Sequence, residues 1–254
     1  MPIVYLLIAF IATTLGTLAG LGGGIVIRPA LDALGDFDVF VIGVLSSATV
    51  LSMSMVSTIR RIISGVKIDK ILVMLAVGGI LGGYIGKLVF QFSLAHITPG
   101  QLTGVQAVVI IILLQITLFK NRLPRFQVDN LSLILLMGIL LGGLASYLGI
   151  GGGPINVAVL CMFFAMDIKE AAAGSIFIIL FSQAAKLVSI ALTTGFGPYD
   201  YSILWYMIPA GVVGGVVGPM LKNKLTHHVI EIIFKVVVIF CVLLNVYNII
   251  RLSA

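Results

Sequence analysis

Eight long apolar segments set the limits on how this chain can fold. A membrane-spanning helix needs about 20 consecutive, predominantly apolar residues. Stretches of that kind cover residues 3–20, 39–59, 71–91, 99–119, 131–149, 168–192, 202–221 and 229–250. Only 9% of the 254 residues are charged, whereas about a quarter is usual in a soluble domain. The sequence therefore predicts an all-α polytopic membrane protein.

Two similar glycine-rich stretches, "AGLGGGIVIRPAL" at 19–31 and "LGIGGGPINVAVL" at 148–160, interrupt this pattern. Each is followed by a shorter apolar piece, residues 25–34 in the first case and 154–165 in the second. These pieces are too short to cross a bilayer and fit a re-entrant half-helix better.

A second similarity indicates that the chain is an internal duplication. "GGILGGYIGKLV" at 78–89 resembles "AGVVGGVVGPML" at 210–221, at nearly the same separation as the two glycine runs. The first repeat is predicted to cover residues 1–119 and the second residues 131–254. The polar segment 120–130, "KNRLPRFQVDN", is predicted to link them.

The distribution of basic residues favours an inverted relation between the two repeats. If every long segment crosses the membrane, eight Lys and Arg face one side and five face the other. If each glycine run is instead the tip of a hairpin that enters and leaves by one face, the division becomes ten against two, with Arg28 inside the hairpin. The positive-inside rule favours the second arrangement. We therefore expect two inverted-topology repeats in the cell (inner, cytoplasmic) membrane, each a glycine-tipped re-entrant hairpin plus three transmembrane helices, with a cytoplasmic linker and both termini outside.

The glycine runs do not match nucleotide-binding loops. Gly24 is followed by Ile25 rather than by the Lys-Ser/Thr of a P-loop, and no βαβ pattern surrounds either run. Close helix packing explains most of the other glycines, those near 78–86 and 211–218 above all.

A helix is predicted to begin at each glycine run, and Pro154 suits the first position of such a helix. Helix N-termini carry a partial positive charge and bind anions. Two tips that enter from opposite faces would meet near the midplane, as in transporters with discontinuous helices. The predicted substrate-binding glycines are Gly22, Gly23, Gly24, Gly151, Gly152 and Gly153.

The paired motifs "AGLGGGIVIRPAL" and "LGIGGGPINVAVL" resemble those of the TauE/SafE (sulfite exporter) family of membrane transporters. The resemblance covers nearly the whole chain. It implies transport of sulfite, organosulfonates or related sulfur-containing anions across the cytoplasmic membrane. Pro29 lies five residues after the first run and Pro154 directly after the second, so the two tips differ in detail.

Polar side chains inside the apolar segments are further candidates for the substrate site. Gln183 and Lys186 share one helical face, and a lysine inside a span usually faces a cavity or a partner. The alternatives are that the lysine snorkels to the headgroups and that the hydroxyls and the asparagine bond to neighbouring backbone. The candidates are Asn156, Ser47, Thr49, Ser182, Gln183 and Lys186.

The polar residues offer no metal-ligand cluster, nucleophile pair or acid pair, so we expect neither an enzyme, a metal nor a cofactor. The net charge of +6 forms no stripe with aromatic residues, which argues against nucleic acid. No carboxylate lies clearly at mid-span, and a membrane potential that is negative inside favours exit of a monoanion by about 2.3 kcal/mol per 100 mV. The expected function is export of a small sulfur anion through the lipid bilayer, by alternating access around the two tips. The alternatives are an importer of thiosulfate or a sulfonate, and a passive anion channel.

Overall fold

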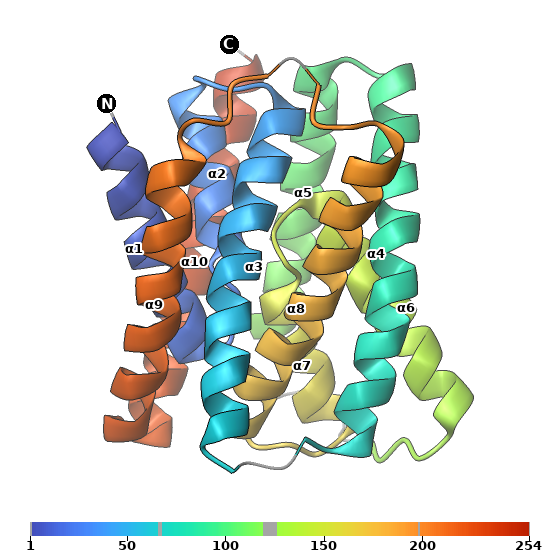
Figure 1. Cartoon of the computed structure of the whole chain (residues 1–254), viewed down its shortest axis with the longest axis vertical. Helices are drawn as coiled ribbons and strands as arrows, with labels where there is room; N and C mark the ends of the chain where they lie inside the picture. Colours follow the sequence, from blue (N-terminus) through green and yellow to red (C-terminus); the bar gives the residue numbers. More distant parts are fainter. Residues whose placement is uncertain (1, 66–67, 119–125, 198, 254) are drawn as a thin grey trace.

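Helices form all the regular structure in the part of the chain that the computed structural model describes, namely residues 2–65, 68–118, 126–197 and 199–253 (Figure 1). Eight of them are long and apolar enough to cross a membrane. In chain order the helices are α1 (Pro2–Ala19), α2 (Gly24–Leu34), α3 (Val39–Ile63), α4 (Lys70–His96), α5 (Pro99–Leu118), α6 (Leu131–Leu148), α7 (Gly153–Phe163), α8 (Ile168–Thr193), α9 (Leu204–Lys224) and α10 (His227–Ser253). The prediction of an all-α polytopic membrane protein is confirmed.

Short polar side chains fix where several of these helices begin. The side chain of Asp69 accepts a hydrogen bond from the amide of Ile71 at the start of α4. Asn130 and Asp167 each accept two such bonds at the starts of α6 and α8. Because an N-cap side chain satisfies amides that lack a partner in the helix, these residues end the preceding loops. The first part of the predicted linker, residues 120–125, lies outside the described residues.

The two short helices, α2 and α7, have 11 residues each. At 1.5 Å per residue each is about 16 Å long, which is too short for a hydrocarbon core of about 30 Å. In Figure 1 α1 runs into the molecule from the end where the N-terminus lies, and α2 returns to that end; α6 and α7 do the same from the opposite end. The inverted repeat of the two halves stays a prediction.

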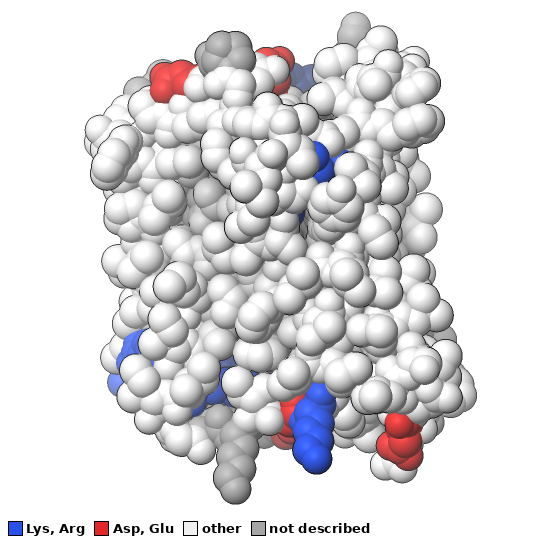
Figure 2. All heavy atoms as spheres, turned by 45° about the vertical axis from the view of Figure 1, so that its right-hand side comes forward, with Lys and Arg blue, Asp and Glu red and all other residues white. Residues whose placement is uncertain are grey.

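Two names describe the ends of the molecule. The terminal face is the end where α1 begins and α10 ends, and the linker face is the opposite end, where α3 ends and α4 begins (Figure 1). Figure 2 shows a largely uncharged surface with Lys and Arg gathered toward the linker face. Many large apolar side chains, such as Leu7, Leu136 and Leu243, are exposed along the sides. An exposed apolar belt of this kind suits contact with lipid.

Glycine stripes bring the long helices into backbone contact. On α4, a methyl group at Gly78 or Gly82 would overlap backbone carbonyls of α6, and on α9, one at Gly214 or Gly218 would overlap threonine side chains of α1. Small residues permit such close approach between helices in lipid. The prediction that these glycines serve packing is confirmed. Each stripe joins a helix of the first half of the chain to one of the second half.

The contribution of the glycine stripe between α4 and α6 to stability can be tested with a matched control. We expect Gly82→Ala to lower stability by about 1–3 kcal/mol, because the added methyl overlaps the carbonyl of Ile139. Gly104→Ala on α5 meets nothing within 4 Å, so the better helix propensity of alanine leaves stability unchanged or raises it by up to about 1 kcal/mol. Thermal unfolding is followed by the reaction of a thiol dye with Cys241, which is fully buried. Equal melting temperatures for the two variants would contradict the stripe.

Candidate functional site

The two glycine runs lie against each other in the core of the protein. All residues of 20–24 and 149–153 are buried. A methyl group at Gly153 would overlap the backbone of Leu21, and one at Gly24 would lie 2.6 Å from the carbonyl oxygen of Ile150. The structure thus brings the two predicted tips together, with no side chain between their backbones at these points.

Backbone geometry explains why the runs consist of glycine. Gly20 and Gly22 have φ values of +74° and +68°, and Gly149, Gly151 and Gly152 have values of +64°, +78° and +72°. L-residues with side chains rarely adopt this left-handed region, whereas glycine enters it freely. The sharp reversal of each hairpin therefore depends on these positions.

Hydroxyl groups from the two flanking helices contact backbone carbonyl groups at the tips. Ser46 Oγ, on α3, donates to the carbonyl of Gly149 at 2.9 Å. Ser175 Oγ, on α8, lies 2.8 Å from the carbonyl oxygen of Gly20 and 3.2 Å from that of Gly153. Because unpaired backbone groups are costly inside a membrane, these bonds hold α3 and α8 against the tips.

A fully buried arginine joins the two hairpins. Arg28, on α2, is 1% exposed and donates to the carbonyl of Leu148 and to Oε1 of Gln106. Gln106 Nε2 in turn donates to the carbonyl of Tyr147 at 2.6 Å, and the Arg28 Nε atom lies 3.7 Å from the carboxylate of Asp32. The guanidinium thus meets the C-terminal end of α6, where a positive charge is favourable.

The sequence pattern predicts that Arg28 lies in the hairpin but indicates no role for it. The signal was available, since an arginine inside an apolar helix must find a partner, and Asp32 follows four residues later. Its other partners, Gln106 and Leu148, lie 78 and 120 residues away in the sequence. Sequence spacing alone does not indicate such contacts.

The N-terminal ends of α2 and α7 have no side-chain cap. Their N-cap residues, Gly23 and Gly152, carry no side chain that accepts from the first turn. Pro154 stands in the first turn of α7, as predicted. The positive ends of two helix dipoles therefore point into the region where the tips meet.

Two buried amide side chains have no hydrogen-bond partner in the described part of the chain. Asn156 is 1% exposed and Gln183 is fully buried. The Asn156 Oδ1 atom lies 3.3 Å from the position that a Cβ atom of Gly152 would occupy, so this amide stands at the second tip. Gln183 lies one helical turn beyond Ile179, whose side chain contacts Gly22. A buried amide without partners costs about 1–3 kcal/mol, so both amides call for an explanation beyond packing.

Lys186 is held inside the bundle between α8 and α3. Its Nζ atom donates to Ser47 Oγ at 2.9 Å and to the carbonyl of Gly43 at 3.3 Å, and the residue is 4% exposed. The ammonium is therefore satisfied within the protein rather than at its surface. From Ile179 to Lys186 the helix rises by about 10 Å, so this pair lies apart from the tip contact, toward the terminal face.

The remaining two candidates bond within their own helices. Thr49 Oγ1 donates to the carbonyl of Leu45 at 2.8 Å, and Ser182 Oγ donates to that of Ile179 at 3.2 Å. This is the alternative that the sequence left open for hydroxyls in spans. The structure does not bring either hydroxyl into the tip contact.

The Arg28 network predicts a large effect from a single substitution. We expect Arg28→Met to cost about 3–5 kcal/mol, because it leaves the buried Asp32 carboxylate without its partner. The double variant Arg28→Met/Asp32→Leu should recover part of this loss. Lys235→Gln is the control, since Lys235 is half exposed and an exposed pair contributes at most about 1 kcal/mol. Thermal unfolding of the three variants checks this, and similar melting temperatures for Arg28→Met and Lys235→Gln would contradict it.

Comparison with known proteins identifies the family. Residues 5–245 match the family described as Sulfite exporter TauE/SafE. The chain is 24% identical to the "Probable membrane transporter protein YunE" of Bacillus subtilis (strain 168), over 93% of this chain and 94% of that one. It is 26% identical to the "Probable membrane transporter protein MJ0441" of Methanocaldococcus jannaschii, over 82% of this chain and 79% of that one. No solved structure matches it significantly. With its spans, its glycine-tipped hairpins and these relatives, the chain belongs to the TauE/SafE sulfite exporter family and is a membrane transporter.

Proposed function

We propose that the protein exports a small sulfur-containing anion, such as sulfite or an organosulfonate, by alternating access around the two glycine tips. One observation carries this proposal. The uncapped N-terminal ends of α2 and α7 meet in the core, beside the unpartnered amide of Asn156. Sulfur enters through the family, whose name refers to sulfite export.

The chemistry of the tips suits an oxyanion. Amide N–H groups in the first turn of a helix point along its axis, and the helix dipole adds a partial positive charge. The Asn156 side chain supplies further donors at the second tip, and Gln183 is available one turn beyond Ile179. Lys186 adds a positive charge on the same face of α8 as Gln183. Neutral donors with one cation nearby bind an anion without trapping it.

The orientation follows from the basic residues at the helix ends. Of the described Lys and Arg at the two faces, most lie at the linker face, whereas Lys87 and Arg251 lie toward the terminal face. The positive-inside rule then places the linker face in the cytoplasm and both termini outside the cell membrane. In that orientation the membrane potential assists exit of a monoanion by about 2.3 kcal/mol per 100 mV, which supports export. The basic residues at the linker face are Arg60, Arg61, Lys70, Lys169, Lys222 and Lys224.

Flux measurements on the purified protein in liposomes test this function. We expect saturable transport of radiolabelled sulfite, inhibited by thiosulfate or by a taurine-like sulfonate. It should run faster when a potential drives anions from the linker face to the terminal face. If none of these anions binds or moves, the sulfur assignment is wrong. Non-saturating conductance would indicate a channel, and flux in the opposite direction against the potential would indicate an importer.

Asn156 offers a sharper test of the tip site than the glycines do. Gly23 and Gly152 have positive φ values, so any side chain placed there strains the backbone and confounds folding with transport. Asn156→Leu instead removes an amide that has no partner and keeps the branched shape of a side chain with four heavy atoms. We expect the thermal stability to stay unchanged or to rise. Flux should fall at least about tenfold, which corresponds to the free energy of one hydrogen bond to a charged ligand.

Asn245→Leu is the matched control for this substitution. Asn245 is also buried, but its Nδ2 atom donates within α10 to the carbonyl of Cys241 at 2.7 Å. We expect flux within about twofold of the unmodified protein, since no ligand role is assigned to this residue. Equal flux in the Asn156→Leu and Asn245→Leu variants would refute a tip site that includes Asn156.

A further inference from the structure

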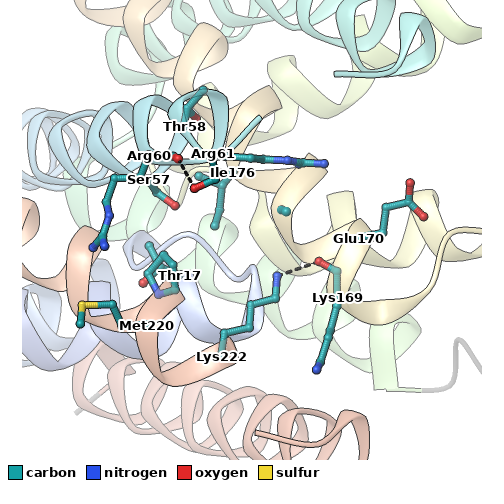
Figure 3. A pocket seen from close by; sticks show the side chains of 13 residues that line it. Thr17, Ser57, Thr58, Arg60, Arg61, Lys169, Glu170, Ile176, Met220 and Lys222 are labelled. Atoms are coloured by element: carbon teal, nitrogen blue, oxygen red, sulfur yellow. Dashed lines mark hydrogen bonds between the residues drawn. The ribbon is translucent and has the colours of Figure 1, made fainter. Parts of the chain in front are cut away.

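A basic pocket opens at the linker face, between α1, α3, α8 and α9 (Figure 3). Its volume is about 460 Å³. Four cationic side chains and one carboxylate line it: Arg60, Arg61, Lys169, Lys222 and Glu170. This concentration of positive charge is unusual in a chain with 15 Lys and Arg in total.

Protein carboxylates do not neutralise these cations. The ion pairs within 4 Å in the described residues are Arg28–Asp32 and Lys235–Glu231, both outside the pocket. A further carboxylate, Asp167, lies near Lys222, and both its hydrogen bonds come from backbone amides at the start of α8. With Glu170 and Asp167 both counted, the pocket keeps an excess of two positive charges.

The cations are held in place by neutral groups. Arg60 Nη1 donates to the carbonyl of Val216 at 3.0 Å, Lys222 Nζ to that of Lys169 at 2.7 Å, and Lys169 Nζ to that of Leu225 at 3.0 Å. The Nη1 atom of Arg61 is buried and has no partner. Figure 3 shows the Arg61 side chain reaching across the pocket toward the side where Glu170 lies. The pocket is thus preorganised for an anion.

The inner end of the pocket adjoins the glycine tips. Thr17 and Ile176 line it. Thr17 lies three residues before Gly20, and Ile176 follows Ser175, whose hydroxyl bonds to the tip carbonyls. An anion in the pocket is therefore separated from the tips by about one turn of α1 or α8.

The terminal face offers much less room. A cavity of about 10 Å³ lies there beside Lys87 and Lys186, with Phe40 and Phe90 in its walls. That is about the space of a single water molecule. The pocket on the linker face, by contrast, has room for an oxyanion together with its hydration water.

We propose that the basic pocket is a recruitment site that binds a small oxyanion at the linker face and delivers it to the tips. The delivery step rests on the proposed function, whereas binding does not. Arg61 is the principal ligand, because its buried Nη1 atom is a donor without a hydrogen-bond partner, and Lys222 supports it. The shared chemistry is a group with several anionic oxygens, which a free sulfite and a lipid phosphate both present. The volume and the hydroxyl-lined inner end favour the free ion.

The test compares kinetic constants of pocket variants in liposomes of zwitterionic lipid. Arg61→Gln and Lys222→Gln should each raise the KM for sulfite at the linker face about tenfold, with kcat changed less than twofold, since each removes a charge-assisted contact outside the tips. Arg61→Lys should restore most of the loss. Lys70→Gln and Lys224→Gln, two exposed lysines of the same face outside the pocket, should leave KM unchanged. KM values for the pocket variants equal to those of these controls would overturn the proposal.

Binding measured without transport separates this proposal from the function of the protein. We expect sulfite and sulfate to raise the melting temperature of the detergent-solubilised protein, and Arg61→Gln to abolish the increase. If no anion is transported but this Arg61-dependent increase remains, the pocket is supported while the exporter function fails. If transport proceeds and Arg61→Gln changes neither KM nor the increase, the pocket proposal fails alone. If the increase depends on added phosphatidylglycerol rather than on sulfite, the occupant is a lipid headgroup and recruitment of a free ion is refuted.

Discussion

A helix that breaks inside a bilayer must find partners for its backbone groups within the protein, and the rest of this structure depends on how that requirement is met. Water is absent from the hydrocarbon core, so each freed carbonyl needs a donor from the chain. Ser46 and Ser175 supply donors to the glycine runs, and Arg28 supplies one to the last turn of α6. These three side chains fix α3, α8 and α2 around the tips. The amide ends of the short helices receive no side-chain cap, so positive potential remains where the two tips meet.

Backbone proximity holds the bundle together where side chains would otherwise intervene. Lipid tails are as apolar as leucine, so helices in a membrane associate through close packing and hydrogen bonds rather than through the hydrophobic effect. The glycine stripes of α4 and α9 provide this contact with α6 and α1. Both contacts pair a hairpin arm of one half of the chain with a long helix of the other. The two halves are therefore interlocked along their length, and neither hairpin is supported by its own half alone.

The sequence was sufficient for the helices and for the meeting of the tips, because both depend on local patterns. Segment length and apolarity predicted the spans to within a few residues. The exceptions are helix ends such as 60–63 and 92–96, where the helix continues past the apolar segment. The triple glycines predicted the two helix breaks. The network around Arg28 escaped prediction because its partners come from α5 and α6, and their approach follows from tertiary packing. Thr49 and Ser182, in contrast, bond within their own helices. A hydroxyl in a span does so unless an acceptor on a neighbouring helix lies closer, and the sequence does not show which case applies. The charged residues of the basic pocket come from three helices, α3, α8 and α9, and only their common position at one face was foreseeable.

The hydroxyl of Ser175 lies within hydrogen-bond distance of one carbonyl from each hairpin, Gly20 at 2.8 Å and Gly153 at 3.2 Å. A serine has a single O–H proton and can give it fully to one acceptor at a time. The two hairpins therefore compete for one proton, and each carbonyl is better satisfied when the other is less so. Ser175 therefore ties α8 to a carbonyl of each hairpin through a single side chain. A displacement of one re-entrant hairpin away from α8 would leave this proton to the other.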